Sequence, residues 1–337
     1  MNKKAGAAIK STLKSVRTKI YILISYILRP LFILRVLPRY VVVRIEGGLA
    51  SQLEQYTLGQ YISDLGYEIR YDLSFYADGD NYDVAGKEIR TLSLQLLDTK
   101  LELKEIKGSL LKLYKNFYEL KFSKEQAKQV DSSYHFRTPV YLNGYGYSLY
   151  TEKGFEEAFG KHISVNYDRM AFGDKNTEIL DQIETSKPSI GLHVRRGDTL
   201  MAKVGRPIAY PQYYLKALSY FDSEIPIYIF SDDMKWVEKE LLPLIPNNDR
   251  CVCVRNNDSE HGWCDMILLS ACTYQIKSPS GGLARDAYRL NRNPDKKLVL
   301  PVFVTGNMAN MQGDIIEIVL DDELCDLSYV RNRNTRL

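Results

Sequence analysis

Three short polar clusters contain residue types that can hold a phosphorylated ligand. The first is His193-x-Arg195-Arg196-x-Asp198. An arginine fork matches a pair of phosphate oxygens and keeps its charge, so two adjacent arginines suit a diphosphate. The alternative interpretation is a surface arginine pair bridged to Asp198, with His193 as a buried histidine whose hydrogen bonds are satisfied within the core.

The second cluster is the turn Ser280-Gly281-Gly282, which opens a predicted helix. Free backbone N–H groups and the positive end of the helix dipole make such a turn an anion site, and the Ser280 hydroxyl adds a donor. A plain connection between a strand and a helix gives the same pattern. The turn therefore indicates an anion site only in combination with the two arginines.

Carboxylates form the third cluster, at Ser231-Asp232-Asp233 and at Asp265. They can accept hydrogen bonds from a ribose or from the N1–H and N2–H edge of guanine, or they can hold Mg²⁺. Asp233 is expected to be the N-cap of a helix that starts at Met234. In the first half of the chain, the pair Gly47-Gly48 lets the backbone approach a ligand closely.

Strands that alternate with helices over residues 189–304 must position these clusters. We expect strands at 189–194, 225–230, 251–254 and 297–304, and helices after Pro211 and over 234–242, 263–271 and 283–290. This order predicts a parallel α/β sheet. Ligands of such sheets bind beyond the carboxyl ends of the strands, where all three clusters lie.

The first half of the chain opens with the same kind of pattern. A β-branched run at 41–45 ends at Glu46, a helix is expected from Leu49 to Tyr61, and a second strand follows at 67–71. Leu and Lys recur at helical spacing over 92–130, which predicts two more helices. With 45% hydrophobic and 26% charged residues, the 337-residue chain has the composition of a globular protein of about two domains.

Charge is distributed unevenly along the chain. The net charge is +3, from 45 basic and 42 acidic residues, yet ten of the basic residues and none of the acidic ones lie within residues 1–45. The remaining 35 basic and 42 acidic residues give the body a net charge of about −7. An acidic body argues against a nucleic-acid-binding protein, which needs a basic face.

Residues 20–28 form an apolar run that ends at Arg29-Pro30. Such a run is too short to span a bilayer, which takes roughly 20 apolar residues, and no small-residue cleavage site follows it. Basic residues beside the run favour a helix that lies on an anionic membrane surface, whereas the alternative is an ordinary first helix with a solvated basic face. We expect a cytoplasmic protein, peripheral to the cytoplasmic face of the membrane.

Five cysteines, all within residues 251–325, are odd in number and make no disulfide framework, so they favour a reducing compartment. Cys251-x-Cys253 and His261-x-x-Cys264 offer four possible zinc ligands. Paired C-x-x-C knuckles are missing, however, and "CVCV" at 251–254 is typical of a buried strand. No metal is expected.

Five segments resemble the α-1,2-fucosyltransferase family, glycosyltransferase family 11: residues 47–56, 141–150, 191–198, 227–241 and 265–276. The H-x-R-R-x-D string is shared with the wider superfamily of α-1,6- and protein O-fucosyltransferases. The resemblance implies an α/β fold of the glycosyltransferase-B type, with two Rossmann-like domains facing a cleft. The implied division is a basic leader at 1–40, an acceptor-side domain at 41–170 and a domain at 171–337 that binds GDP-fucose.

The resemblance also implies the reaction: inverting transfer of L-fucose from GDP-β-L-fucose to a galactoside hydroxyl, in α-1,2 linkage, without a metal or other cofactor. The acceptor implied is a galactose-terminated glycan precursor, such as O-antigen or a lipid-linked oligosaccharide. The implied catalytic residues are Arg195, which holds the β-phosphate, and Asp198. The resemblance does not assign the base that takes the acceptor proton, and two carboxylates stay candidates for it: Asp198, in the motif, and Glu46, which precedes the glycine turn. The other implied ligand-binding residues are His193, Arg196, Asp232, Asp265, Ser280, Gly47 and Gly48 for the donor, and Gln52, Tyr145 and Tyr147 for the acceptor.

The chain departs from the family pattern at two places. Ser51 stands where the family usually has Asn, and "SGGLARD" at 280–286 replaces an aromatic S-F-S-W-W-G stretch. The second segment is closer to the α-1,6 and nodulation branch. Two alternatives therefore stay open: a fucosyltransferase of another linkage, and a module that binds a GDP-sugar without transferring it.

Overall fold

The computed structural model describes residues 15–16, 19–20, 22–24, 26–77, 79, 81–83, 86, 88–117, 139–143, 152–201, 207–302 and 313–327. The chain forms two compact units. Unit 1 comprises Met1–Glu46, Glu54–Gly79 and Glu102–Ala158, and unit 2 comprises Gly47–Leu53, Asp80–Leu101 and Phe159–Leu337. Residues 47–53 thus belong with the C-terminal unit, a grouping that a single division at residue 170 does not give. A cleft between two domains stays a prediction.

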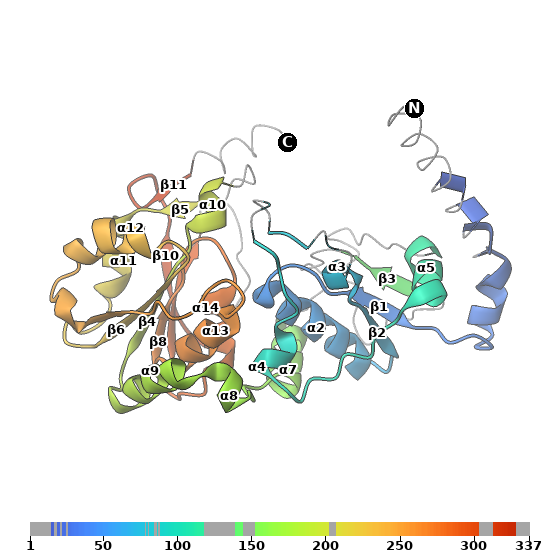
Figure 1. The fold of residues 1–337 in the computed structure, drawn as a ribbon, viewed down its shortest axis with the longest axis horizontal. Coiled ribbons are helices and arrows are strands. Elements are labelled where there is room, and N and C mark those ends of the chain that lie inside the picture. Colours follow the sequence, from blue (N-terminus) through green and yellow to red (C-terminus); the bar gives the residue numbers. More distant parts are fainter. Residues whose placement is uncertain are drawn as a thin grey trace. The chain divides into compact units, whose positions relative to one another are not determined.

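Unit 1 contains a three-stranded parallel sheet in the order β2-β1-β3. Its strands are β1 (Val41–Arg44), β2 (Ile69–Asp72) and β3 (Val140–Leu142), and α2 (Leu49–Asp64) connects β1 with β2 (Figure 1). This confirms the predicted β-loop-α-β opening. Because β2 and β3 lie on opposite sides of β1, the boundary between β1 and β3 is a topological switch point, where ligands bind in such sheets.

Further helices complete unit 1. They are α3 (Ser74–Ala77), directly after β2, and α5 (Gly108–Phe117), which packs beside β3. The helical segment that ends at 33 reaches the core of the unit through Phe32, which is buried with Val42, Tyr114 and Tyr141. Among the described residues, no helix combines the length and the apolar character that crossing a membrane requires.

Unit 2 contains a six-stranded parallel sheet in the order β10-β9-β8-β4-β6-β7. The strands are β4 (Ile190–Val194), β6 (Ile227–Ser231), β7 (Cys251–Cys253), β8 (Tyr274–Ile276), β9 (Lys297–Val302) and β10 (Asp314–Val319). The chain runs outward from β4 through β6 to β7 and returns to the other side of β4 with β8. The switch point of this sheet is therefore the boundary between β4 and β8.

Helices cover both faces of this sheet, as expected for parallel strands. One face carries α11 (Pro211–Leu218) and the stretch from α12 (Met234–Trp236) through the π-helical turn Val237–Leu241. The other face carries α13 (Gly262–Ala271), which packs against α9 (Asp174–Thr185) and α14 (Leu283–Leu290) (Figure 1). The remaining described elements of the unit are short: α4 (Leu94–Leu97), α8 (Arg169–Phe172), α10 (Gly197–Met201), the antiparallel pair β5 (Ile208–Ala209) and β11 (Cys325–Asp326), and two 3₁₀ turns (Leu242–Leu244 and Asn248–Arg250). Helix α7 (Glu152–His162) connects the two units along the chain.

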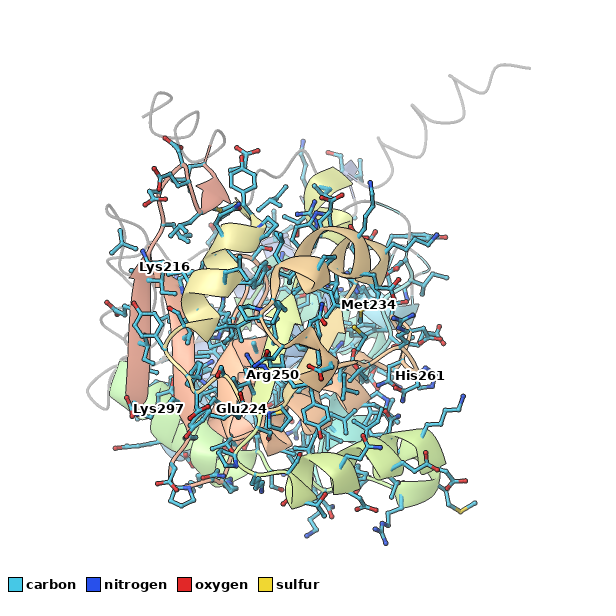
Figure 2. The ribbon with its side chains drawn as sticks, turned by 90° about the vertical axis from the view of Figure 1, so that its left-hand side faces the viewer. Lys216, Glu224, Met234, Arg250, His261 and Lys297 are labelled. Atoms are coloured by element: carbon cyan, nitrogen blue, oxygen red, sulfur yellow. The ribbon has the colours of Figure 1, made fainter. Side chains whose placement is uncertain are left out.

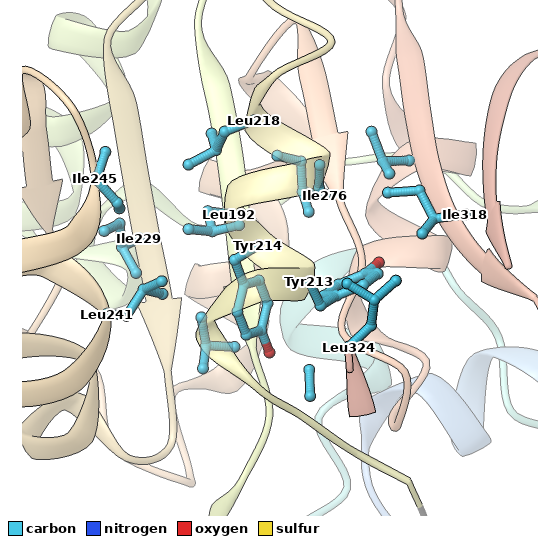
Figure 3. Packing of buried hydrophobic residues seen from close by; sticks show 14 of the residues in the cluster. Leu192, Tyr213, Tyr214, Leu218, Ile229, Leu241, Ile245, Ile276, Ile318 and Leu324 are labelled. Atoms are coloured by element: carbon cyan, nitrogen blue, oxygen red, sulfur yellow. The ribbon is translucent and has the colours of Figure 1, made fainter. Parts of the chain in front are cut away.

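Alternate strand residues build the core on the α11 face. Leu192, Ile229 and Ile276 come from three neighbouring strands and lie under Tyr213 and Tyr214 of α11 (Figure 3). All five are buried, and burial of a side chain of this size stabilises the fold by roughly 1.5–3 kcal/mol. This core fixes the strand ends that carry the polar clusters.

The two ends of the strands have different surroundings. Glu224, Arg250 and Lys297 mark the amino ends of β6, β7 and β9, whereas Met234 lies near the opposite, carboxyl edge (Figure 2). The polar clusters predicted from the sequence all follow carboxyl ends. The structure therefore confirms their placement at one edge of the parallel sheet.

One predicted helix, 234–242, is wrong in its detail. The chain is α-helical only to Trp236, then π-helical, and it ends in a 3₁₀ turn that contains Pro243. Proline has no N–H to donate to the preceding turn, so the regular helix cannot continue. The predicted helix 283–290 is confirmed to the residue, whereas β3, β8 and β10 were not predicted.

Candidate functional site

Arg195 and Arg196 leave the carboxyl end of β4 and meet Asp232, which follows the neighbouring strand β6. Nε of Arg195 lies 3.2 Å from Oδ2 of Asp232, and the backbone N–H of Arg196 donates to Oδ1 at 2.8 Å. Both oxygens of Asp232 thus face the arginine segment. This geometry lets Asp232 orient Arg195, and its predicted contact with the donor stays a prediction.

The two arginines have different surroundings. The Arg196 guanidinium lies 3.9 Å above the ring of Trp236, and its Nε is 3.6 Å from Oδ2 of Asp233. Asp233 also accepts a hydrogen bond from the backbone N–H of Trp236, which confirms the predicted N-cap. The Arg195 side chain is 25% exposed and that of Arg196 only 13%, so Arg195 is the more accessible cation.

The loop after β8 lies directly against these residues. A Cβ at Gly281 would stand 3.6 Å from Cγ of Arg195 and 3.7 Å from Cε1 of His193. Gly281 has a φ of +81°, a conformation that favours glycine. The fold therefore brings together, at the β4/β8 switch point, two clusters that lie far apart in the sequence.

Internal hydrogen bonds hold the loop in place. Nζ of Lys277, which is 3% exposed, donates to the carbonyls of Ser278 at 2.8 Å and Pro279 at 3.4 Å. From α11, Tyr213 donates to the carbonyl of Lys277, and the Tyr214 hydroxyl is 3.2 Å from Oγ of Ser278. The sequence analysis did not single out Lys277, although a lysine directly after a buried strand was a usable signal.

Ser280 sits inside this loop. It is buried, and its hydroxyl lies 3.4 Å from that of Thr199 in α10. Its position before the first turn of α14 is the one predicted for an anion site. Asp198, the other implied catalytic residue, lies in α10 by its backbone, but its side chain is outside the described part of the structure.

His193 is buried at the end of β4. Burial, with the charges of Arg195 and Lys277, lowers its pKa to about 3, so the imidazole is neutral at physiological pH. No described residue forms a hydrogen bond with its Nδ1. A neutral ring with one donor and one acceptor nitrogen suits a base or a ribose better than a phosphate.

Asp265 lies in the first turn of α13, at the carboxyl edge of the same sheet. Burial raises its pKa to about 7, against the effect of a hydrogen bond from Nδ2 of Asn257 at 2.6 Å. Asn257 in turn donates to Oδ1 of Asn176 at 3.0 Å. The sequence analysis considered Asn257 only as part of a chance glycosylation motif; the fold makes it the partner of Asp265.

Gly47 and Gly48 open α2 beside the β8–α14 loop of unit 2. A Cβ at Gly282 would come 2.9 Å from that of Ala50, so the Gly282 turn lies against the first turn of α2. Gly47 has a φ of +81°. The chain at the start of α2 therefore lies close to this loop, whereas the predicted approach of Gly47 and Gly48 to a ligand stays a prediction.

Gln52 is a structural residue, which corrects its predicted contact with the acceptor. It is fully buried, and its Nε2 donates to the carbonyls of Gly47 at 3.1 Å and Thr91 at 2.8 Å. Its Oε1 accepts from the backbone N–H groups of Ser93 and Leu94. These four hydrogen bonds occupy both donors and the acceptor of the Gln52 amide and join α2 to the segment 91–94. Tyr145 and Tyr147, the other predicted acceptor residues, lie outside the described residues.

A buried ion cluster occupies the segment where the family has aromatic residues. The carboxylate of Asp286 is fully buried between Arg289, 2.7 Å away, and Arg285, whose Nε is 3.2 Å away. Two arginines around one aspartate leave an excess positive charge in the first turns of α14. This cluster replaces aromatic packing by ionic packing behind the Gly282 turn.

The described residues contain no group of three His, Cys, Asp or Glu side chains close enough to hold a metal. Cys251 and Cys253 lie in β7 as free thiols, and Nδ1 of His261 pairs with Asp258 at 2.7 Å. The zinc ligands considered from the sequence are thus not assembled in this part of the chain.

With the geometry established, comparison with known proteins identifies the family. The model of glycosyl transferase family 11 matches residues 87–281, more than half of the chain. The protein belongs to glycosyltransferase family 11. It is therefore a glycosyltransferase, as the H-x-R-R-x-D segment and its neighbours predicted.

Two curated relatives come from Escherichia coli. The family member is 34% identical over 116 residues to the O-antigen biosynthesis glycosyltransferase WbnK, a match that covers 33% of this chain and 37% of that protein. It is 26% identical over 257 residues to an alpha-1,2-colitosyltransferase, covering 70% of this chain and 82% of that protein. The chain thus matches only about a third of the first relative and most of the second.

Two solved structures are also similar to this glycosyltransferase. The fucosyltransferase NodZ from Bradyrhizobium gives a TM-score of 0.45 at 14% identity, covering 74% of this chain and 92% of that one. POFUT1 in complex with GDP gives a TM-score of 0.40 at 9% identity, with coverages of 77% and 97%. The α/β class of this chain is evident from its own two parallel sheets.

Proposed function

We propose that this glycosyltransferase moves L-fucose from GDP-β-L-fucose to a galactoside hydroxyl of a glycan precursor, with inversion and in α-1,2 linkage. The single observation that carries the proposal is the meeting of Arg195, His193 and the Gly281 turn at the β4/β8 switch point. Family membership and the names of the curated relatives support the chemistry.

The proposed mechanism depends on charge that develops on the leaving group. When the bond between fucose C1 and the β-phosphate oxygen breaks, its electron pair passes to GDP. Arg195, oriented by Asp232, and the backbone turn at Ser280 stabilise that charge more in the transition state than in the ground state. They supply positive charge that a divalent metal supplies in other enzymes, so we expect activity in the presence of EDTA.

His193 and Asp265 would bind the guanosine part of the donor. The neutral imidazole of His193 offers hydrogen bonds without attracting phosphate, and the carboxylate of Asp265 can accept from the N1–H and N2–H edge of guanine. These roles divide the site into a cationic part for the diphosphate and a polar part for the nucleoside.

An activity assay tests the proposal. We expect the protein to form a fucosylated product from GDP-fucose and β-galactosides with EDTA present, and Arg195→Ala to lose at least a hundredfold in rate, the size seen when a preorganised transition-state donor is removed. Arg255→Ala, at an exposed arginine paired with Glu238, is the matched control and should keep full activity. Substantial activity in Arg195→Ala would refute the assignment.

The products separate this proposal from its alternatives. Linkage analysis of the product distinguishes α-1,2 from α-1,6 transfer, and a parallel assay with the GDP-colitose donor tests the sugar suggested by one relative's name. GDP binding without turnover of any donor would instead indicate a binding module without transfer activity.

We also propose that the N-terminal helical segment holds the enzyme on an anionic membrane surface. Leu28 and Phe32 pack inward on unit 1, whereas Ile20, Leu23 and Ile27, at helical spacing, are 52%, 62% and 65% exposed. Ten basic residues and no acidic one lie within residues 1–45. An exposed apolar stripe beside this charge suits the interface of an anionic bilayer, with the protein on the cytoplasmic face.

Co-sedimentation with vesicles tests this localisation. Binding is expected to phosphatidylglycerol-containing vesicles and to weaken at high salt, but not to vesicles of phosphatidylcholine alone. Replacing Leu23 and Ile27 by Glu should abolish it, whereas Met170→Glu, at a side chain that is 92% exposed in unit 2, should not. Unchanged binding after removal of residues 1–35 would contradict the proposal.

A further inference from the structure

The carboxyl edge of the unit 1 sheet carries a second polar cluster, independent of the arginine site. Arg44 is the last residue of β1, and Asn143 directly follows β3. Nη1 of Arg44 donates to Oδ1 of Asn143 at 3.2 Å, and Nε of Arg44 lies 3.1 Å from Oε2 of Glu46. These three side chains span the β1/β3 switch point, where the topology of a parallel sheet leaves a ligand position.

Beneath this edge lies a rigid charged support. Asp72, at the end of β2, is fully buried and receives Nζ of Lys115 at 2.8 Å, the hydroxyl of Tyr141 and the backbone N–H of Ser74 at 2.9 Å. Every one of these partners is fixed by a strand or helix of unit 1. The support holds the strand ends in place but is too deeply buried to contact a ligand itself.

Glu46 is held from two sides and stays within reach of solvent. Its backbone N–H donates to Oε1 of Gln55 at 2.8 Å, and its side chain is 15% exposed, against 28% for Arg44. Nε2 of Gln55, which is almost fully buried, has no hydrogen-bond partner among the described residues. The edge thus combines the carboxylate of Glu46, the guanidinium of Arg44 and the amide of Asn143, which contacts between these side chains orient in the absence of a ligand.

The chemistry of this edge favours a neutral polyhydroxyl ligand. The carboxylates of Glu46 and Asp72 oppose the binding of a second phosphate, and the cations Arg44 and Lys115 oppose the binding of a metal. A sugar ring presents hydroxyls that both donate and accept, which matches a carboxylate beside a guanidinium and an amide. A hydroxyl that donates to an ionised carboxylate makes a charge-assisted, strong hydrogen bond.

We propose that Arg44, Glu46 and Asn143 bind the hydroxyl groups of the acceptor sugar, with Glu46 accepting a hydrogen bond from one of them. The inference rests on the proposed function, since it requires that the enzyme has a glycan acceptor. It names three residues of unit 1 for acceptor recognition: Arg44 and Glu46 lie outside all five segments that carry the family resemblance, and Asn143 lies within the segment 141–150.

Glu46→Gln tests the assignment, because the amide keeps the size of the side chain but loses its charge. The chain offers a matched control at the other end of the same sheet. There, Glu68 pairs with Nη2 of Arg70 at 2.6 Å, and the Glu68 side chain is 57% exposed. We expect Glu46→Gln to lower kcat/KM for the galactoside about tenfold or more, the loss of a hydrogen bond to a charged group. Glu68→Gln should stay within twofold of the unmodified enzyme.

Three readouts separate recognition of the acceptor from damage to the fold. The Kd for GDP and the KM for GDP-fucose should stay unchanged in Glu46→Gln, and so should the thermal midpoint. Arg44→Lys, which keeps the charge but loses the planar fork, should show the same selective loss. Unchanged acceptor kinetics in Glu46→Gln, or an equal loss in Glu68→Gln, would overturn the inference and leave the proposed function standing. Absence of transfer by the unmodified protein overturns both.

Discussion

The carboxyl edges of the two parallel sheets gather polar residues at their switch points, but the two edges differ in net charge. At the β4/β8 edge, the three cations Arg195, Arg196 and Lys277 outnumber the two nearby carboxylates of Asp232 and Asp233. At the β1/β3 edge, Glu46 and Asp72 balance Arg44 and Lys115. The same topology thus provides an excess of cations suited to a diphosphate in one unit and a balanced polar surface suited to a neutral sugar in the other.

Two buried aspartates, Asp265 in unit 2 and Asp72 in unit 1, differ in the direction in which their pKa is shifted. Burial raises the pKa of both Asp265 and Asp72, but Asp72 also receives hydrogen bonds from Lys115, Tyr141 and Ser74, which together hold its pKa below the usual value. Asp265 has only Asn257, and its pKa rises to about 7. The number and charge of the donors, rather than depth, decide whether a buried carboxylate stays ionised at neutral pH.

Lys115→Met is expected to have the largest effect on stability, because it leaves the buried Asp72 without its cation. Breaking a buried pair from one side costs about 3–5 kcal/mol. Urea unfolding should show this loss in the free energy of unfolding at pH 7. Lys112→Met, at an exposed position of the same helix, should cost less than about 0.5 kcal/mol. A loss below about 1 kcal/mol in Lys115→Met would mean that Tyr141 and Ser74 suffice to keep Asp72 charged.

The next largest effect should be the pH dependence that Asp265 gives to the free energy of unfolding. The folded chain keeps this proton up to pH about 7, whereas an unfolded chain releases it near the ordinary pKa of 3.8. The group therefore lowers the free energy of unfolding as pH rises from about 4 to about 7, and Asp265→Asn should remove that decline.

The affinity for GDP should change with pH in the opposite direction to the stability if the ionised carboxylate of Asp265 binds guanine. Affinity should increase as pH rises through about 7, with up to a tenfold gain per pH unit below the pKa, and binding should release a proton. Calorimetry in two buffers of different ionisation enthalpy measures that release. Asp265→Asn should show weak, pH-independent binding, and Asp258→Asn, at an exposed carboxylate, should behave like the unmodified protein. A flat pH profile in the unmodified protein would exclude Asp265 from nucleotide binding.

Gly281→Ala should give the smallest of these effects. A φ of +81° costs an alanine about 1–2 kcal/mol, while the space beside Gly281 tolerates a Cβ at 3.6 Å from Arg195. The loop should shift slightly, with a GDP affinity reduced by less than about thirtyfold. Gly160→Ala, at a helical glycine with open space around it, should leave GDP affinity unchanged. Equal affinities in both variants would show that the loop makes no close contact with the nucleotide.

Much of unit 2 could be predicted because its elements have strong local signals. The strand at 190–194 is a continuous apolar run, and the α14 boundaries follow from glycines before and an asparagine after the helix. β8 was missed because its three residues become a strand only by pairing with β4 and β9. Ligands of parallel α/β sheets bind beyond the carboxyl ends of the strands, and this generalisation alone predicted that the arginines and the Gly281 turn lie at the same edge.

The partners of individual side chains could not be predicted in the same way. Gln52 lies in a segment that resembles a ligand-binding motif, yet its amide is used up by the carbonyls of Gly47 and Thr91 and the N–H groups of residues 93 and 94. Asn257 had no distinctive spacing, and the residue it contacts, Asn176, lies far along the chain. Lys277 donates to the carbonyls of its sequence neighbours Ser278 and Pro279, but its own carbonyl accepts from the distant Tyr213. Hydrogen-bond saturation is a property of the packed structure, so spacing does not reveal it.

By itself, the sequence determined the alternation of strands and helices, the two glycine turns, the arginine pair and the basic apolar N-terminus, because each depends on residues within a few positions of one another. Only the tertiary structure decided which carboxylates stay charged, which arginine is accessible, and that Arg44, Glu46 and Asn143 meet at one sheet edge. Burial, ion pairing and hydrogen bonding join residues tens of positions apart, and the local pattern of the chain does not encode those distances.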